Sequence, residues 1–334
     1  MAAFTTIDDS EAYFQVQLYT GNGSANHAIT LDGDTAMQPD MVWIKNRDAA
    51  DSHCLFDAVR GATEVLHPDA TTAETTDADT LTSFDSDGFA LGDDDKVNTN
   101  TEKYVAWCWK ESATSGFDIV GFTGNETNRT VSHSLSAVPH YMVVRTRNGA
   151  AGRNYSVYHH KNTSAPETDH IFWDSTQATE DDATIWQDTA PTSSVFSIGT
   201  NLGVNEDTKN IIAFLWTEKQ GFSKFGGYTG NGNADGAFVY TGFRPAWVMI
   251  KRTDGTQGWL MWDNKRLGYN VDNNHLQTHG SDAEGTADTL DLLSNGFKIR
   301  ESGAGTNGSG NTYIYFAFAE APFVNSNGVP NNAR

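Results

Sequence analysis

The chain has 334 residues and a formal net charge of −21, with 38% hydrophobic and 19% charged residues. A surface this negative repels phosphate backbones, so the composition excludes nucleic acid as an expected partner. No apolar run approaches the roughly 18–20 residues that cross a bilayer, and we expect no membrane insertion. The first residues contain neither the basic nor the apolar region of a secretory signal, which predicts assembly in a cytoplasm.

Gly, Asn, Thr, Ser and Asp make up much of the remaining sequence. These residues favour turns because they accept positive φ or bond locally to the backbone. Runs of Leu, Glu, Lys and Ala, which are typical of long helices, do not occur. The predicted fold class is therefore all-β, with short strands joined by many polar turns.

The first predicted strand lies in "FQVQLYTGNG", where Phe14 and Val16 alternate with glutamines in the period of a half-buried strand. The Thr-Gly-Asn-Gly that follows predicts a chain reversal. An apolar run led by Pro39, "PDMVWIKNR", predicts the next strand, and "SDGFALG" at 86–92 is a further landmark of the unit. The run "KYVAWCWKE" at 103–111 is apolar at both odd and even positions, which predicts a central strand in a sheet packed on both faces.

These landmarks recur twice in the same order, as "VGFTGNET", "PHYMVVRTR", "SSVFSIG" and "NIIAFLWTE", then as "GGYTGNGN", "PAWVMIKRT", "SNGFKIR" and "TYIYFAFAE". A unit of about 100 residues has the size of one β-sandwich or jelly-roll domain. We therefore predict three tandem β-sandwich repeats at 1–112, 113–220 and 221–323, and an extended C-terminal arm at 324–334. No flexible linker separates the units, so we expect them to pack as a rigid body. Strand exchange between neighbouring units is the alternative.

A carboxylate and an arginine three residues apart recur in the first and third units, as Asp57 and Arg60 in "FDAVR" and as Asp263 and Arg266 in "WDNKR". The second unit has "YHHKN" there instead. A basic residue also lies six positions after each strand-leading proline, at Lys45, Arg145 and Lys251. One interpretation is a polar ligand pocket repeated along the molecule. The favoured alternative is an ion pair or turn at a strand end that fixes register.

Tryptophans are a second candidate for ligand binding, because sugars stack on aromatic faces. Five of the nine lie inside apolar runs and are interpreted as core residues: Trp43, Trp107, Trp109, Trp216 and Trp247. Trp173 and Trp186 lie in the polar stretches "IFWDST" and "TIWQDT". These two are the predicted glycan contacts.

Cofactor and catalytic motifs are not convincing anywhere in the sequence. His275 and His279 have the spacing of a helical zinc site, but Leu276 occupies the position of the glutamate base. "GAGTNG" at 303–308 precedes a predicted strand, which makes it a hairpin loop and not a dinucleotide site. The carboxylates around Asp93 are interpreted as turn residues, with calcium binding as the alternative. We predict no metal, no cofactor and no enzymatic activity.

The chain has two cysteines, Cys54 and Cys108. Two cysteines do not make a disulfide framework, so free buried thiols are predicted. A single bridge inside the first unit is the alternative.

The sequence resembles a group of virion proteins from marine tailed bacteriophages, often labelled tail-fibre-like. The resemblance lies in the YTGN turns and in "QPDMVWIKNR", "DSHCLFDAVRGAT", "SFDSDGFALG", "YVAWCWK" and "YIYFAFAEAPF", and it covers nearly the whole chain. It implies a structural or adhesive component on the exterior of a phage particle, with other phage structural proteins as partners. It offers no catalytic motif to carry over. Such proteins are β-rich homotrimers, which implies a homo-oligomer here.

Three functions follow as hypotheses. The first is a non-enzymatic fibre or receptor-binding protein of the tail, whose loops contact host surface glycan. The second is a capsid decoration or knob protein attached to the shell. The third is a polysaccharide depolymerase, which paired carboxylates among the 43 acidic residues would have to support.

Overall fold

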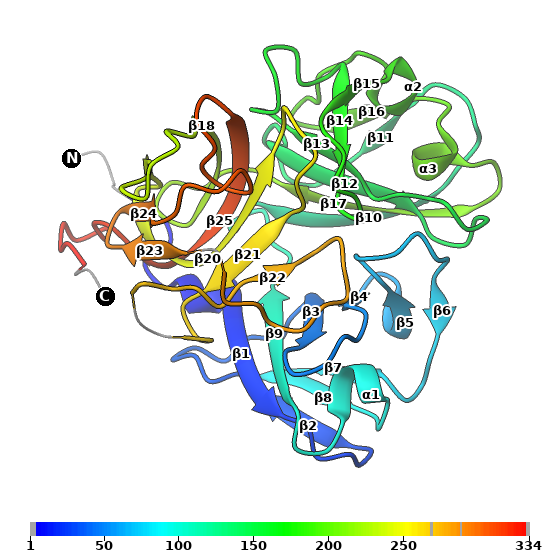
Figure 1. Ribbon diagram of the computed structural model, residues 1–334. Helices are drawn as coiled ribbons and strands as arrows, with labels where there is room; N and C mark the ends of the chain where they lie inside the picture. Colours follow the sequence, from blue (N-terminus) through cyan, green and yellow to red (C-terminus); the bar gives the residue numbers. More distant parts are fainter. Residues whose placement is uncertain (1–4, 268–269, 288, 332–334) are drawn as a thin grey trace.

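The computed structural model describes residues 5–267, 270–287 and 289–331, and it is almost entirely β-structure. The all-β prediction is confirmed. The ribbon forms three lobes in chain order: blue to cyan at the bottom, green at the upper right, and yellow to red at the left (Figure 1). We call residues 5–112, 113–220 and 221–323 units 1, 2 and 3. None of the described helices is long and apolar enough to cross a membrane.

Unit 1 contains nine strands and two short helices. They are η1 (Ser10–Ala12), β1 (Phe14–Thr20), β2 (His27–Thr30), β3 (Met41–Asn46), β4 (Cys54–Asp57), β5 (Gly61–Leu66), β6 (Thr75–Thr76), β7 (Leu81–Asp85), β8 (Gly88–Leu91), α1 (Asp95–Asn98) and β9 (Lys103–Trp109). Six strands form a main sheet in the order β1-β9-β3-β4-β5-β6, and three form a small sheet in the order β2-β8-β7.

Unit 2 repeats this plan with one strand fewer in the small sheet. Its elements are β10 (Phe117–Thr123), β11 (Arg129–Ser132), β12 (Tyr141–Thr146), β13 (Ser156–His159), β14 (Asp169–Phe172), β15 (Glu180–Asp181), α2 (Ala183–Trp186), β16 (Val195–Ile198), α3 (Leu202–Asn205) and β17 (Asn210–Trp216). The main sheet has the order β10-β17-β12-β13-β14-β15, and the small sheet pairs β11 with β16.

Unit 3 has the same two sheets. Its strands are β18 (Ser223–Thr229), β19 (Phe238–Tyr240), β20 (Phe243–Arg252), β21 (Leu260–Asp263), β22 (Leu276–Gln277), β23 (Leu290–Leu293), β24 (Gly296–Ile299) and β25 (Thr312–Pro322). The main sheet has the order β18-β25-β20-β21-β22, and the small sheet β19-β24-β23. Every sheet of the described chain is built from strands of one unit, so strand exchange does not occur there.

The closing strand of each unit is an internal strand of its main sheet, as predicted, and lies second from one edge. Antiparallel pairing sets Trp107 of β9 opposite Val16 on one side and opposite Trp43 on the other. In the same way, β17 lies between β10 and β12 in unit 2, and β25 lies between β18 and β20 in unit 3. The apolar residues on both faces of these strands are therefore covered on both sides.

One hydrophobic core is shared by all three units. Val105, Trp107 and Trp109 point into it, whereas Tyr104 and Cys108 face a separate core between the two sheets of unit 1. Unit 2 has a comparable core of its own, and the inner residues of unit 3 merge with the shared one. Burial of each large apolar side chain contributes about 1.5–3 kcal/mol, so the shared core holds the three units together.

Aromatic contacts cross between units inside the shared core. The rings of Trp43 and Trp173 lie 5.0 Å apart, those of Tyr141 and Phe316 stack at 4.3 Å, and those of Trp109 and Trp247 meet edge to face at 5.8 Å. These pairs join unit 1 to unit 2, unit 2 to unit 3, and unit 1 to unit 3. The ring of units is therefore closed.

The repeated Thr-Gly-Asn turn is a corner between sheets, whereas the sequence predicted only a chain reversal. β1 belongs to the main sheet and β2 to the small one, so the turn leads the chain from one sheet to the other. A Cβ atom on Gly21 would lie 2.1 Å from the Thr99 carbonyl oxygen, and a Cβ on Gly124 would lie 2.1 Å from that of Glu206. Glycine recurs here because the turn packs directly against backbone.

A buried asparagine holds each of these turns. Asn98 accepts a 2.9 Å bond from the backbone N–H of Asn22, which is the asparagine of the first turn. Asn205 and Asn307 accept equivalent 3.0 Å bonds in units 2 and 3. Each of the three lies six residues before the second residue of a closing strand, a spacing that the sequence already displays.

Two further predictions about connections are wrong. The "GAGTNG" segment at 303–308 joins β24 of the small sheet to β25 of the main sheet, so it is not a hairpin loop. The described part of the predicted arm, 324–331, turns back on itself through a bridge between Val324 and Pro330. Its Ser326 amide donates a 2.7 Å bond to Asp8, which ties it to the first described segment.

Both cysteines are buried and free, as predicted. Burial raises the pKa of the Cys54 and Cys108 thiols well above the usual range. The predicted boundaries at 112/113 and 220/221 fall in the short connections between β9 and β10 and between β17 and β18.

Candidate functional site

The Asp57–Arg60 pair is buried within unit 1. Neither side chain is exposed, and the Arg60 Nε donates to the Asp57 carboxylate. Arg60 also donates from Nη2 to the Leu55 carbonyl oxygen at 2.8 Å and from Nη1 to that of Glu64 at 2.9 Å. Asp263 and Arg266 of unit 3 repeat this arrangement, with Nε to Oδ2 at 2.6 Å. These residues fix β4 and β21 to the turns that follow, so the ligand-pocket interpretation is wrong.

Each of these arginines also holds a glutamate that reaches the next unit. Glu74 receives a 2.9 Å bond from Arg60 Nη1 and two bonds, 2.8 and 2.6 Å, from Arg147 of unit 2. In the same way Glu284 of unit 3 joins Arg266 to Arg47 of unit 1. We call each glutamate with its two arginines a clasp. Clasps close the contact of unit 1 with unit 2 and the contact of unit 3 with unit 1.

The three recurring basic residues are buried and bond to backbone carbonyl oxygens. Arg145 donates to Ala70 of unit 1 at 2.8 Å, and Lys251 donates to Gln177 of unit 2 at 2.8 Å. Lys45 donates within its own unit, to Ala49 at 3.0 Å. Burial lowers the pKa of Lys251 to about 7.

The predicted glycan contacts Trp173 and Trp186 are both fully buried, at 0% and 1% exposure. Trp173 packs in the shared core and donates from Nε1 to the Tyr141 hydroxyl at 2.5 Å. Trp186 packs in the core of unit 2. Neither ring presents a face to a ligand, so this prediction is wrong. The five tryptophans predicted in the core are all buried there.

Within the described ranges, no group of three or more His, Cys, Asp or Glu side chains is placed to hold a metal ion. His275 forms a β-bridge with Gly285, and His279 lies in a separate shallow pocket beside Gly258. The two histidines do not share a helix.

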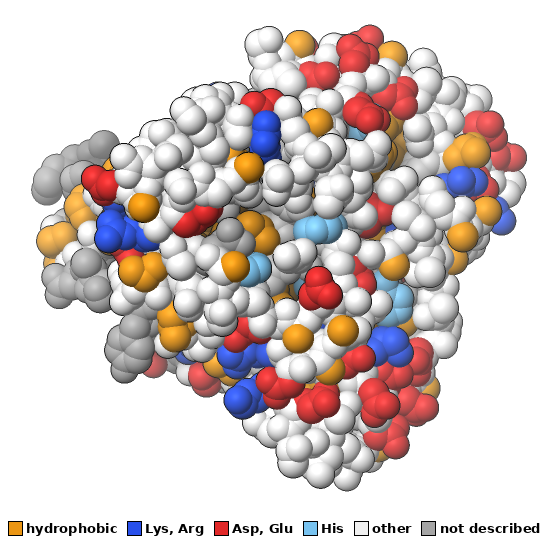
Figure 2. Space-filling view, viewed as in Figure 1, with side chains coloured by type: hydrophobic (Ala, Val, Ile, Leu, Met, Phe, Trp, Pro, Cys, Tyr) orange, Lys and Arg blue, Asp and Glu red, His pale blue; other side chains and the backbone are white. Residues whose placement is uncertain are grey.

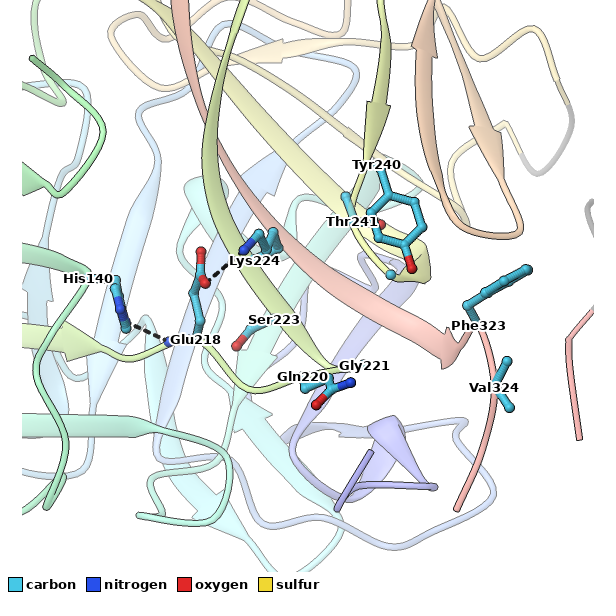
Figure 3. Close-up of a pocket in the computed structure, with 11 residues that line it drawn as sticks. His140, Glu218, Gln220, Gly221, Ser223, Lys224, Tyr240, Thr241, Phe323 and Val324 are labelled. Carbon is cyan, nitrogen blue, oxygen red and sulfur yellow. Dashed lines mark hydrogen bonds and ion pairs between the residues drawn. The ribbon is translucent and has the colours of Figure 1, made fainter. Parts of the chain in front are cut away.

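A groove of about 480 Å³ lies where unit 2 passes into unit 3, and we call it the junction groove. It is lined by His140, Glu218, Gln220, Gly221, Ser223, Lys224, Tyr240, Thr241, Gly242, Phe323 and Val324. Figure 3 shows Glu218 and Lys224 toward one end and the rings of Tyr240 and Phe323 toward the other. The residues come from the position just before β12, the connection between β17 and β18, the start of β18, the end of β19 with the turn that follows it, and the segment after β25.

The polar end of the junction groove is fixed by hydrogen bonds around Glu218. Its carboxylate accepts from Lys224 Nζ at 2.9 Å and from the Phe225 backbone at 2.9 Å, and His160 Nε2 lies 3.6 Å away. His140 Nδ1 accepts from the Glu218 backbone at 3.1 Å. Burial by itself would raise the pKa of Glu218, but the bonds from His160, Lys224 and Phe225 outweigh it and lower the pKa to about 2.

The equivalent junction between units 1 and 2 has the opposite electrostatic character. Glu111 occupies the position of Glu218 and receives a 3.3 Å bond from the Ile119 backbone, but Asp118 stands where Lys224 stands. Burial and the hydrogen bond shared with Asp118 raise the pKa of Glu111 to about 7. The glutamate position is thus structural in both junctions, and only the second junction presents a fixed ion pair.

The aromatic end of the junction groove is peculiar to unit 3. Tyr240 is 58% exposed and Phe238, on the same face of β19, is 49% exposed. Tyr240 of unit 3 pairs with Gly296 across the small sheet. The equivalent residue is Thr30 in unit 1, where it pairs with Gly88, and Ser132 in unit 2. The exposed aromatics thus replace small residues, a difference that comparing the three copies in the sequence would have shown.

Figure 2 shows Asp and Glu side chains spread over the lobes of units 1 and 2 on the visible face.

An exposed ring beside fixed polar groups is an arrangement that suits a sugar, because the ring covers the apolar face of the sugar while carboxylate and ammonium groups bond to its hydroxyls. The junction groove combines an exposed ring with a fixed ion pair.

A family model described as a domain of unknown function, DUF7483, matches residues 9–322. The chain belongs to the DUF7483 family. The match begins just before η1 and ends at the last residue of β25, so a single DUF7483 domain includes all three units and their shared core. No curated protein matches this DUF7483 chain.

Proposed function

We propose that the protein is a non-enzymatic structural component of a tailed-bacteriophage particle, fibre-like or receptor-binding, that attaches to host surface glycan. The sequence motifs shared with tail-fibre-like virion proteins support its place on the outside of a particle. The shared core supports a mechanical role, because three units packed on one core resist separation. The acidic surface suits a protein that must not adhere to the packaged genome.

The proposed attachment to glycan rests on one observation, the exposed Tyr240 at the mouth of the junction groove. The equivalent positions of units 1 and 2 are occupied by Thr30 and Ser132. A 58% exposed ring contributes little to folding and is available for stacking. Such a ring, placed beside a fixed Glu218–Lys224 pair, suits a sugar better than an apolar partner.

The test is binding of purified protein to a panel of marine bacterial strains. We expect Tyr240→Ala to weaken binding about tenfold to a hundredfold, because a stacked aromatic contributes about 1–3 kcal/mol. Thr30→Ala, at the equivalent position of unit 1, should bind as the unaltered protein does. Equal binding by both variants would show that the junction groove is not the adhesive site.

Copy number separates this proposal from capsid decoration. Quantitative mass spectrometry of purified particles should find few copies for a tail component and many for a decoration protein. The native mass of the purified protein should correspond to a trimer. Release of reducing ends from host glycan would instead support a depolymerase.

A further inference from the structure

Each of the three contacts between units contains an equivalent backbone hydrogen bond. The amide of Glu74 donates to the Arg147 carbonyl oxygen at 2.8 Å, that of Thr179 to Thr253 at 2.9 Å, and that of Glu284 to Arg47 at 2.9 Å. Each bond joins the loop after a main-sheet hairpin to the residue that follows the third strand of the next unit. The backbone is therefore equivalent at all three contacts, and the side chains can be compared position by position.

The contact of unit 2 with unit 3 has lost its clasp. Thr179 stands where the other contacts have glutamate, and Thr253 stands where they have the second arginine. Asn162 stands where they have Arg60 or Arg266, since it follows His159 by three residues and His159 pairs with Tyr141 as Asp57 pairs with Met41. Three long charged side chains are thus replaced by three short neutral ones.

A cavity occupies the place of the missing clasp. It has a volume of about 850 Å³, and Asn162, Thr179 and Thr253 all line it. Asn162 is only 6% exposed, and its Oδ1 accepts a 2.6 Å bond from the Thr179 hydroxyl. Its Nδ2 has no hydrogen-bond partner among the described residues. An unpartnered buried amide N–H group costs about 1–3 kcal/mol, so an acceptor that reached this donor would stabilise the contact.

The remaining lining favours a ligand that carries hydroxyl groups. Asp169, Asp181 and Asp254 offer carboxylate acceptors, and the hydroxyls of Thr163, Thr229 and Thr312 can donate or accept. Tyr228, stacked on Tyr313 at 5.0 Å, gives the wall an aromatic surface. Lys161 is the one basic residue in the lining, against the three carboxylates. An anion would be repelled, and the described carboxylates are not grouped for a metal ion.

We propose that this cavity, which we call the open interface, is a second binding site that takes a neutral saccharide between units 2 and 3. A sugar hydroxyl accepts from Asn162 Nδ2 while neighbouring hydroxyls donate to the aspartates. The ligand contacts both units and completes the contact that the clasp completes elsewhere. The inference does not depend on where the protein sits in a particle, because binding is a property of the isolated chain.

The chain supplies the variant that tests it. Thr179→Glu with Thr253→Arg copies the Glu74–Arg147 pair, places two long charged side chains in the cavity and offers Asn162 Nδ2 a protein acceptor. Binding of maltotriose, laminaritriose and chitotriose is measured by saturation-transfer NMR and titration. We expect at least one of them to bind the unaltered protein and not the double variant. Asn162→Leu, of similar size, is a second variant that removes both the Nδ2 donor and the Oδ1 acceptor of the Thr179 hydroxyl, and it should weaken binding about tenfold.

Tyr240→Ala is the matched control, because it alters the junction groove and leaves the open interface intact. Retained binding by this variant supports the proposal. Loss of binding in Tyr240→Ala but not in the double variant would place the sugar in the junction groove and overturn it. Failure of all three trisaccharides to bind, or binding of calcium ions alone, would also overturn it. None of these results bears on attachment to cells, which tests the proposed function separately.

Discussion

The contact between units 1 and 2 and the contact between units 2 and 3 have the same backbone and different chemistry. The first closes over Glu74 and its two arginines, and its junction glutamate, Glu111, faces another carboxylate. The second has no charge in place of the clasp, and its junction glutamate, Glu218, faces Lys224. The fold therefore does not require the clasp.

Other contacts hold units 2 and 3 together. Tyr141 stacks on Phe316, His159 bonds through Nε2 to the Tyr315 carbonyl oxygen at 3.1 Å, and Trp259 donates to that of Phe172 at 2.7 Å. Aromatic packing and backbone bonds thus suffice for an interface in this molecule. A buried ion pair is weak evidence for stability as such, but removing one partner of an existing pair is costly.

The largest effect is expected at the clasp. Glu74→Gln removes the charge that two arginines share and should lower the free energy of unfolding by about 3–5 kcal/mol. Thr179→Ala, at the same position of the other contact, should cost about 1 kcal/mol, because it removes a single bond to Asn162. Urea unfolding of both variants measures the difference. Equal losses would mean that the clasp is not the distinguishing feature of the two contacts.

The next effect is a pH dependence at the first junction. The pKa of Glu111 is raised to about 7 in the folded chain from an ordinary 4.5, so the folded state retains a proton that the unfolded state releases. This contribution to stability is complete below pH 4.5 and is lost as the pH rises through about 7. For a half-buried group in partial contact with solvent we expect a loss of about 1–2 kcal/mol between pH 5 and pH 8. Thermal unfolding across that range should show it, and Glu111→Gln should remove it.

Glu218 gives the opposite sign at the second junction and serves as the control. Its pKa is lowered to about 2 from an ordinary 4.5, so its contribution is present above pH 4.5 and is lost as the pH falls through about 2. The titration of Glu218 itself therefore adds nothing to the slope between pH 5 and pH 8, and Glu218→Gln can alter that slope only through the neighbouring His140 and His160. A slope that vanished in Glu218→Gln as it does in Glu111→Gln would show that the two junctions are not electrostatically distinct.

The smallest effect is expected from closing the open interface. Thr179→Glu with Thr253→Arg should change the free energy of unfolding by less than about 1 kcal/mol, because the gain from a partly exposed ion pair nearly balances its desolvation. Chemical denaturation checks this directly. A loss of several kcal/mol would show that the cavity cannot accept the side chains that fill its counterparts.

Much of the architecture was readable from the repeated pattern. Strong apolarity on both faces of "KYVAWCWKE" predicted a central strand, and β9 is one. The pattern could not show what covers each face, and one face of Trp107 and its neighbours turns out to pack against the other two units. Trp173 and Trp186 were misjudged because polar neighbours in sequence do not determine which side chains the fold brings around a ring.

The candidate sites were less accessible to sequence reasoning. Asp57 and Arg60 were correctly recognised as a repeated pair, but the glutamate that makes them an inter-unit contact, Glu74, lies in a loop without a fixed pattern. Asn162, Thr179 and Thr253 are ordinary polar residues in the sequence. Their role is recognised only when the three contacts are compared, because these residues occupy the positions of charged residues in the other two contacts and line the cavity.

Unit 3 contacts unit 1 through the ion pair of Glu284 with Arg47, so none of the three repeats is a terminal repeat. A linear solenoid can gain or lose repeats because its end repeats carry caps. Here a duplicated unit could not pack against the shared core, because three units already surround it. Deletion of one unit would expose the core-facing residues of both its neighbours. The number three is thereby fixed by geometry.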